Sequence, residues 1–140
     1  MKVESNQREK QKIILDSNAL FLPLQFKVDI FSELQKLLNK NFELILLSPV
    51  KYELEMLIQK GPPKTRKNAK FALDMTEKFT YVATNYPPNT PVDDAIIKTA
   101  SKWGCPVVTN DKLLRKRLRD ISVPVIYLRQ KSHLEIDGMI

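Results

Sequence analysis

Short apolar runs alternate along this chain with longer segments in which apolar residues recur every three or four positions. The short runs predict buried strands, and the longer segments predict amphipathic helices. Five strands are expected, at residues 13–16, 42–47, 80–83, 106–109 and 123–128. Five helices are expected between them, at residues 29–38, 48–60, 64–78, 93–103 and 111–118.

Residues that commonly start or end helices support several of these boundaries. Ser48 followed by Pro49 predicts a helix start, with the serine as N-cap and the proline in the first turn. Gly61-Pro62-Pro63 and Gly104 predict helix ends. Three prolines within residues 84–91 predict an irregular loop before the next helix.

Strands that alternate with helices are typical of an α/β fold with a parallel sheet covered on both faces. We therefore expect a three-layer α/β/α domain with a central five-stranded parallel sheet over residues 13–128. Residues 1–12 are polar and are expected to form a flexible N-terminal tail, and residues 129–140 a C-terminal tail. At 140 residues the chain has little room for a second domain.

The charge balance narrows the class of partner. With 23 Lys and Arg against 16 Asp and Glu, the net charge is +7, which favours polyanions such as nucleic acid. An acidic protein or an anionic membrane surface would also fit that charge. The single cysteine, Cys105, excludes an intrachain disulfide. No apolar run is long enough to cross a bilayer, and the polar start does not resemble a secretory leader, so we expect a cytoplasmic protein.

Carboxylates follow the predicted strands. Asp16 ends the first strand, Glu53 lies in the second turn of the helix after the second strand, Asp93 and Asp94 follow the proline-rich loop, and Asp111 follows the fourth strand. In a parallel sheet these positions share one edge, where such folds bind ligands. Each acid has a simpler explanation: Asp93, Asp94 and Asp111 as helix caps, Asp16 as a turn residue, Glu53 as a solvated side chain.

Taken together, the acids favour a metal site. Crowded carboxylates repel one another and raise each other's pKa unless a cation neutralises them. Oxygen ligands favour Mg²⁺ or Mn²⁺. Such ions promote hydrolysis of phosphodiesters, and the basic surface would hold the phosphate backbone.

At this point the sequence resembles the PIN-domain nucleases. The resemblance rests on four ordered segments: Ile13-Ile14-Leu15-Asp16-Ser17-Asn18, Ser48-Pro49-Val50-Lys51-Tyr52-Glu53-Leu54, Asp93-Asp94-Ala95-Ile96 and Val107-Val108-Thr109-Asn110-Asp111. The segments at 22–31 and 125–130 are similar to archaeal and eukaryotic PIN proteins that process small-subunit ribosomal RNA precursors. The resemblance implies a parallel α/β/α fold, Mg²⁺ or Mn²⁺, and single-stranded RNA as substrate.

The resemblance also assigns roles to residues. It makes Asp16, Glu53, Asp94 and Asp111 the catalytic and metal-binding acids. Asp94 is chosen over Asp93 because the family's acid directly precedes the small and apolar residues of the helix. Supporting positions around the metal are expected at Ser17, Asn18, Asp93 and Thr109.

Two basic clusters are candidates for binding RNA phosphates. One comprises Lys112, Arg115, Lys116 and Arg119, beside Asp111, and the other comprises Lys64, Arg66 and Lys67. The simpler explanation of each is a solvated helix face. Phe21, Phe26 and Tyr86 are expected in loops, where they would stack on bases or join the core.

We therefore expect a metal-dependent endoribonuclease that acts in ribosomal RNA precursor processing. One alternative is the toxin ribonuclease of a toxin–antitoxin pair. Another is a module that binds RNA or a ribosome-assembly factor without cleaving. The sequence is also compatible with a homodimer. No membrane partner is expected.

Overall fold

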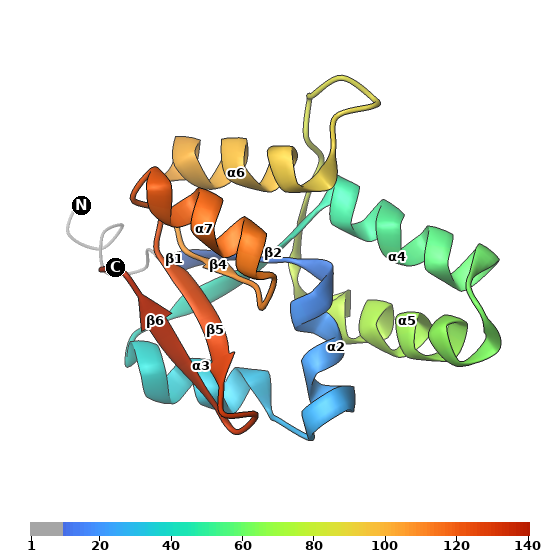
Figure 1. Ribbon diagram of the computed structural model, residues 1–140, viewed down its shortest axis with the longest axis horizontal. Helices are drawn as coiled ribbons and strands as arrows, with labels where there is room; N and C mark the ends of the chain where they lie inside the picture. The colour runs from blue at the N-terminus through green and yellow to red at the C-terminus, as the bar shows by residue number, and fades with distance from the viewer. Residues whose placement is uncertain (1–9) are drawn as a thin grey trace, which may run out of the picture.

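The computed structural model describes residues 10–140 and shows a single mixed sheet surrounded by helices (Figure 1). Its described strands are β1 (Gln11–Leu15), β2 (Phe42–Leu47), β3 (Thr80–Val82), β4 (Val107–Val108), β5 (Val125–Arg129) and β6 (His133–Asp137). Its described helices are α2 (Ser17–Phe26), α3 (Ile30–Leu38), α4 (Ser48–Lys60), α5 (Pro63–Met75), the short 3-10 helix η1 (Thr76–Lys78), α6 (Val92–Trp103) and α7 (Lys112–Asp120).

The strand order is β3-β2-β1-β4-β5-β6, and all pairs except β5–β6 are parallel. The predicted α/β fold with a parallel sheet is therefore confirmed. From β1 the chain builds outward to β3, then returns to β4 on the other side of β1. This reversal places the ligand-binding crevice of the fold at the carboxyl ends of β1 and β4.

Continuous apolar runs in the central strands explain why the sheet is covered on both faces. Ile13, Ile14 and Leu15 of β1 are almost fully buried, as are Val107 and Val108 of β4. In Figure 1, α6 lies on one side of the sheet and α3 on the other. No helix within residues 10–140 combines the length and the apolar character that crossing a bilayer requires.

The sheet has one strand more than the sequence analysis expected. Residues 133–137, assigned to a C-terminal tail, form β6, which pairs antiparallel with β5 from Val125↔Asp137 to Arg129↔His133. Only Leu134 of β6 is buried, so the strand lacks the apolar run by which the other strands were recognised. Of the expected N-terminal tail, residues 1–9 lie outside the described part of the chain, and Gln11 and Lys12 belong to β1.

Helix α2 was not predicted from the sequence, which was expected to form a loop around Phe21 and Phe26. Both lie in α2 and pack against the core, so they are not free to stack on bases. Pro23 inside the helix obscured it, since proline normally interrupts a helix. Asp16 caps this helix by accepting a hydrogen bond from the Ser17 backbone.

The start of α4 differs from the prediction by one residue. Leu47 occupies the N-cap position, and Ser48 is the first helical residue. The Ser48 hydroxyl oxygen instead accepts a hydrogen bond from the Thr84 backbone N–H at 3.0 Å. This hydrogen bond attaches the loop before α6 to the helix that carries Glu53.

Candidate active site

The carboxyl edge of the sheet brings four acidic segments together. The parallel register Leu15↔Val108 sets the end of β1 beside the end of β4, so Asp16 and Thr109 become neighbours. Helices α2 and α7 start directly after these strands. Helices α4 and α6 also touch each other at this edge and contribute Glu53 and Asp93.

Asp16 is the most buried of the acids, with 4% of its surface exposed. Its Oδ1 accepts from the Ser17 N–H at 2.7 Å, and its Oδ2 accepts from Asn18 Nδ2 and Thr109 Oγ1, both at 2.9 Å. The pKa of Asp16 is raised to about 6, mainly by burial. The hydrogen bonds from Thr109 and Ser17 lower this pKa, and the charges of Asp93 and Glu53 add to the rise. The three hydrogen bonds therefore hold the Asp16 carboxyl group in one orientation. Its burial makes the charged form less favourable than in water.

A polar network fixes the frame around Asp16. Thr109 Oγ1 accepts from the Asp111 N–H at 3.1 Å, and Asn18 Oδ1 accepts from the Asn110 N–H at 3.0 Å. Asn110 Oδ1 in turn accepts from the Leu128 N–H at 2.7 Å, which joins the end of β4 to β5. Asn18 and Thr109 thus lie where supporting residues were expected. Asn110 was not singled out, although its place between two other polar residues at a strand end was a signal for it.

The geometry separates the adjacent acids Asp93 and Asp94. Asp94 Oδ1 accepts a hydrogen bond from Arg117 Nη2 at 2.8 Å. Partial burial raises the pKa of Asp93, and the charge of Asp111 is the next largest cause. Asp93 also raises the pKa of Asp16, so it interacts with both neighbouring acids. The charge of Asp93 thus acts on two of the other acids, whereas Asp94 is bound to Arg117. The choice of Asp94 as a metal-binding acid stays a prediction.

Neither Asp93 nor Asp94 caps α6, because Pro91 is the N-cap and no side chain provides a capping bond. Side-chain capping is thereby excluded for these two acids, although both lie in the first turn of α6, where negative charge suits the helix dipole. Asp111 does cap α7, and its Oδ1 accepts from the Leu113 and Leu114 N–H groups at 2.9 and 3.2 Å. Both capping bonds use the same oxygen, so Oδ2 remains free of them.

Glu53 carries the clearest sign of a missing partner. Its Oε1 atom is buried and has no hydrogen-bond partner within residues 10–140. An unsatisfied buried carboxylate oxygen is destabilising, and a cation would satisfy it. In the described part of the chain, however, the side chains as they stand bring no three Asp, Glu, His or Cys residues close enough to hold a metal ion. The donor types fit a divalent ion, but the acids would have to converge to bind one.

The two basic clusters have different surroundings. Arg115 and Arg119 of α7 are engaged by Asp137 of β6, at 3.1 and 3.2 Å. Lys116 lies 3.8 Å from Asp120, and Lys112 is exposed. On α5, Lys64, Arg66 and Lys67 are all exposed. The two arginines expected to bind RNA therefore have another partner, and Lys116 has an exposed one, whereas Lys112 and the α5 cluster take part in no described ion pair.

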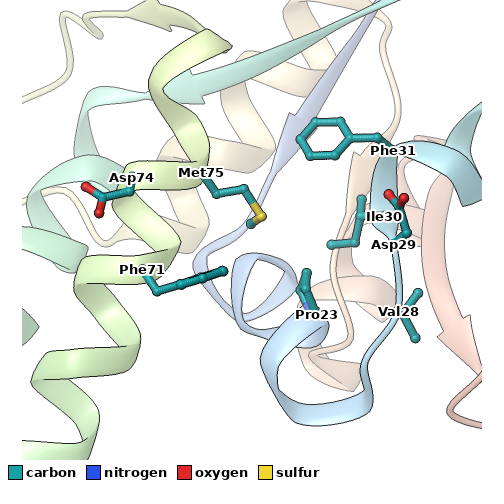
Figure 2. A pocket seen from close by; sticks show the side chains of 8 residues that line it. All are labelled: Pro23, Val28, Asp29, Ile30, Phe31, Phe71, Asp74 and Met75. Atoms are coloured by element: carbon teal, nitrogen blue, oxygen red, sulfur yellow. The ribbon is translucent and has the colours of Figure 1, made fainter.

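An apolar groove lies away from the acids at the sheet edge. This groove between α2, α3 and α5 has a volume of 490 Å³. Figure 2 shows Pro23, Phe31, Phe71 and Met75 among the side chains that line it. None of the acids at the sheet edge lines it. It is therefore a separate surface feature and not part of the candidate active site.

Comparisons with known proteins identify the family. A family model described as "PIN like domain" matches residues 13–131. Ribonuclease VapC4 of Methanocaldococcus jannaschii is 34% identical over 130 residues, which cover 92% of this chain and 98% of that relative. Ribonuclease VapC9 of Archaeoglobus fulgidus is 30% identical over 124 residues, covering 89% and 87%. The solved PIN domain endonuclease Utp24 superposes with a TM-score of 0.77 at 26% identity, covering 92% of each chain. The resemblance drawn from the four acidic segments is confirmed, and the chain belongs to the PIN-like domain family.

Proposed function

We propose that this protein is a metal-dependent endoribonuclease whose active site is the acidic cluster at the carboxyl ends of β1 and β4. The observation that carries the proposal is the buried Glu53 oxygen, which has no partner in the described part of the chain and lies near Asp16, whose pKa is raised to about 6. A protein with a net charge of +7 that gathers acids at one edge is suited to a cation there and a polyanion around it. The ribonuclease names of the two curated relatives support RNA as the substrate.

Asp16, Glu53 and Asp93 would hold the ion, with Asp111 beside Asp93. When bound, a divalent ion would activate a water molecule and neutralise charge that develops on the phosphodiester. Thr109 and Asn18 fix the orientation of Asp16 through their hydrogen bonds. The supporting role of Ser17 is limited to its backbone N–H, which donates to Asp16 Oδ1.

The cellular role we favour is that of a toxin ribonuclease held inactive by a protein antitoxin. Both curated relatives carry the VapC ribonuclease name, which supports this alternative better than ribosomal RNA processing. The complete set of acids argues against a module that binds RNA or an assembly factor without cleaving. Purification of the protein from its native host distinguishes these roles: a toxin copurifies with a small inhibitor that abolishes cleavage, and a processing enzyme cuts a ribosomal precursor at one position.

The proposed activity is tested directly with purified protein. We expect cleavage of unstructured RNA with Mn²⁺ or Mg²⁺, slower cleavage of structured RNA, and none with EDTA. Restoring Mn²⁺ after EDTA should restore cleavage, which excludes irreversible damage by the chelator. Cleavage that persists unchanged in EDTA would contradict the metal-dependent proposal.

A second prediction concerns the path of the RNA. We expect Lys64, Arg66 and Lys67 of α5 to bind phosphates, because all three are exposed and none takes part in a described ion pair. Glutamine at all three should weaken RNA binding and lower the slope of log affinity against log salt by about one unit for each phosphate that is no longer neutralised. The measurement is a salt titration of affinity for a noncleavable RNA.

The matched control removes the same charge from the opposite edge of the sheet. Lys40, Lys78 and Lys102 are exposed and shortly precede parallel strands β2, β3 and β4. Glutamine at these three positions should change the salt slope much less. Equal slopes for the two triple variants would mean that α5 is a solvated face.

A further inference from the structure

The C-terminal strand β6 carries an ion-pair cluster that the proposed nuclease function does not use. The family match ends at residue 131, before β6 begins. At the end of this strand, Asp137 Oδ2 accepts from Arg115 Nε and Nη2 at 3.2 and 3.1 Å, and Asp137 Oδ1 accepts from Arg119 Nε at 3.2 Å. One carboxylate thus holds two arginines of α7.

Other residues around this cluster also contact the two arginines. The Arg115 guanidinium carbon lies 3.7 Å from the centre of the Tyr127 ring, and Arg119 Nη1 donates to the Val123 carbonyl at 3.4 Å. Gly138 follows with φ +111°, and a Cβ there would lie 2.7 Å from Arg119 Nη1. A side chain at this position would be strained and would press on the guanidinium. All three charged side chains are about two-thirds buried, at 33% to 36% exposure, which strengthens their attraction relative to an exposed pair.

Helix α7 connects this cluster to the candidate active site. Arg115 and Arg119 are four residues apart and so share one face of the helix. The same helix begins at Asp111, whose Oδ1 is bound to the first turn through the Leu113 and Leu114 amides. The Asp111 carboxylate must therefore follow any shift of α7. Another side of the helix is attached to α6 through the Arg117–Asp94 pair.

We propose that Asp137 is a positioning residue for the nuclease site: by anchoring α7 to β6, it keeps the Asp111 carboxylate beside Asp93. The proposal rests on the proposed nuclease function for its consequence in catalysis, and on the geometry alone for its effect on Asp111. A displacement of about 1 Å at a reacting group can cost about 100-fold in rate. Outer residues that orient metal ligands typically contribute about 10- to 100-fold.

The test compares Asp137→Asn with Asp120→Asn. Asp120 is also bound to a basic residue of α7, Lys116, but through an exposed pair at 3.8 Å, so the control changes the net charge equally. We expect Asp137→Asn to lower kcat about 10- to 100-fold while KM for RNA changes by less than about twofold. Asp120→Asn should leave both unchanged, and Asp137→Glu should recover part of kcat.

A second measurement does not depend on cleavage. Backbone amide NMR signals of residues 111–114 should shift in Asp137→Asn and not in Asp120→Asn. Mn²⁺ should broaden these signals in the unmodified protein, and Asp137→Asn should need about 10-fold more Mn²⁺ for the same effect. If Asp137→Asn does not fold, Arg119→Lys, which keeps the charge and loses the planar fork, takes its place.

The outcomes separate the two proposals. An unmodified protein that cleaves no RNA with any metal contradicts the nuclease function, while the amide signals still report on Asp137. A folded Asp137→Asn variant with unchanged kcat, or with unshifted amide signals at residues 111–114, overturns the positioning role. Equal losses in Asp137→Asn and Asp120→Asn also overturn it, because net charge would then explain both.

Discussion

Asp16→Asn is expected to abolish RNA cleavage and to leave the metal-free protein at least as stable as the unmodified chain at pH 7. Asp16 is buried and interacts with the charges of Glu53 and Asp93, so it is central to the set of acids that would hold the ion. Loss of several kcal/mol of transition-state stabilisation corresponds to a fall in kcat/KM of about 10³-fold or more. The measurement is single-turnover cleavage of a short RNA at saturating Mn²⁺.

The stability of the same variant follows from the raised pKa. Burial is the main reason that the pKa of Asp16 rises from 3.8 to about 6, so between these values the folded protein holds a proton that the unfolded chain releases. The free energy of unfolding of the metal-free protein therefore falls as the pH rises from about 4 through 6. The full effect at pH 7 is on the order of 3 kcal/mol. Asparagine at this position removes this destabilisation, but it also loses hydrogen bonds worth about 1 kcal/mol.

Urea denaturation in EDTA at pH 4.5 and 7.5 checks this pH dependence. The unmodified protein should be less stable at the higher pH because of Asp16, and Asp16→Asn should lose that part of the difference. A variant that is clearly less stable than the unmodified protein at pH 7.5 would mean that the Asp16 hydrogen bonds outweigh the cost of burying its charge. Full cleavage activity in Asp16→Asn would contradict the active-site assignment.

Asp93→Asn and Asp94→Asn are expected to differ strongly although they remove the same charge from adjacent residues. Asp93 interacts with Asp111 and Asp16, so its loss should lower kcat/KM about 10³-fold through lost metal binding. Asp94 is bound to Arg117 in a half-exposed pair, and its loss should cost about 1 kcal/mol or less, which is under tenfold in rate.

Mn²⁺ titration of both variants gives an independent comparison. Asp93→Asn should bind the ion much more weakly than the unmodified protein, and Asp94→Asn should bind it almost normally. Asp94→Asn should instead show a small loss of thermal stability, because Arg117 loses its partner. The reverse ranking of the two variants would show that the sequence-based choice of Asp94 was right and that the side chains rearrange when the ion binds.

The parallel sheet was predictable because its central strands are continuous apolar runs, which can be recognised from the local sequence. A strand buried on both faces must be apolar throughout, and the runs at Ile13–Leu15 and Leu44–Leu47 meet that condition. Parallel strands alternating with helices then bring Asp16, Glu53, Asp93 and Asp111 to one edge, whatever the details of packing. The acidic segments could therefore be grouped from their order along the chain alone.

The elements that escaped prediction depend on tertiary interactions. Strand β6 buries only Leu134 and is held by its pairing with β5 and by the Asp137 cluster, so its sequence carries little periodic signal. Helix α2 contains a proline, and its packing against α4 and α5 offsets the lost backbone hydrogen bond. In both cases the neighbours, rather than local preference, stabilise the conformation.

The sequence by itself determined the fold class and the edge of the sheet at which the acids gather, because these follow from periodicity and chain order. It determined the family through the resemblance of four acidic segments. Only the tertiary structure showed that Arg117 binds Asp94 while the charges of Asp93 and Asp111 interact, and that Asp137 binds two arginines of α7. Successive residues on a helix point about 100° apart, so a shift of one position selects a different neighbour. Which neighbour a residue contacts depends on the packing of helices that are far apart in the chain. A local sequence pattern does not contain that information.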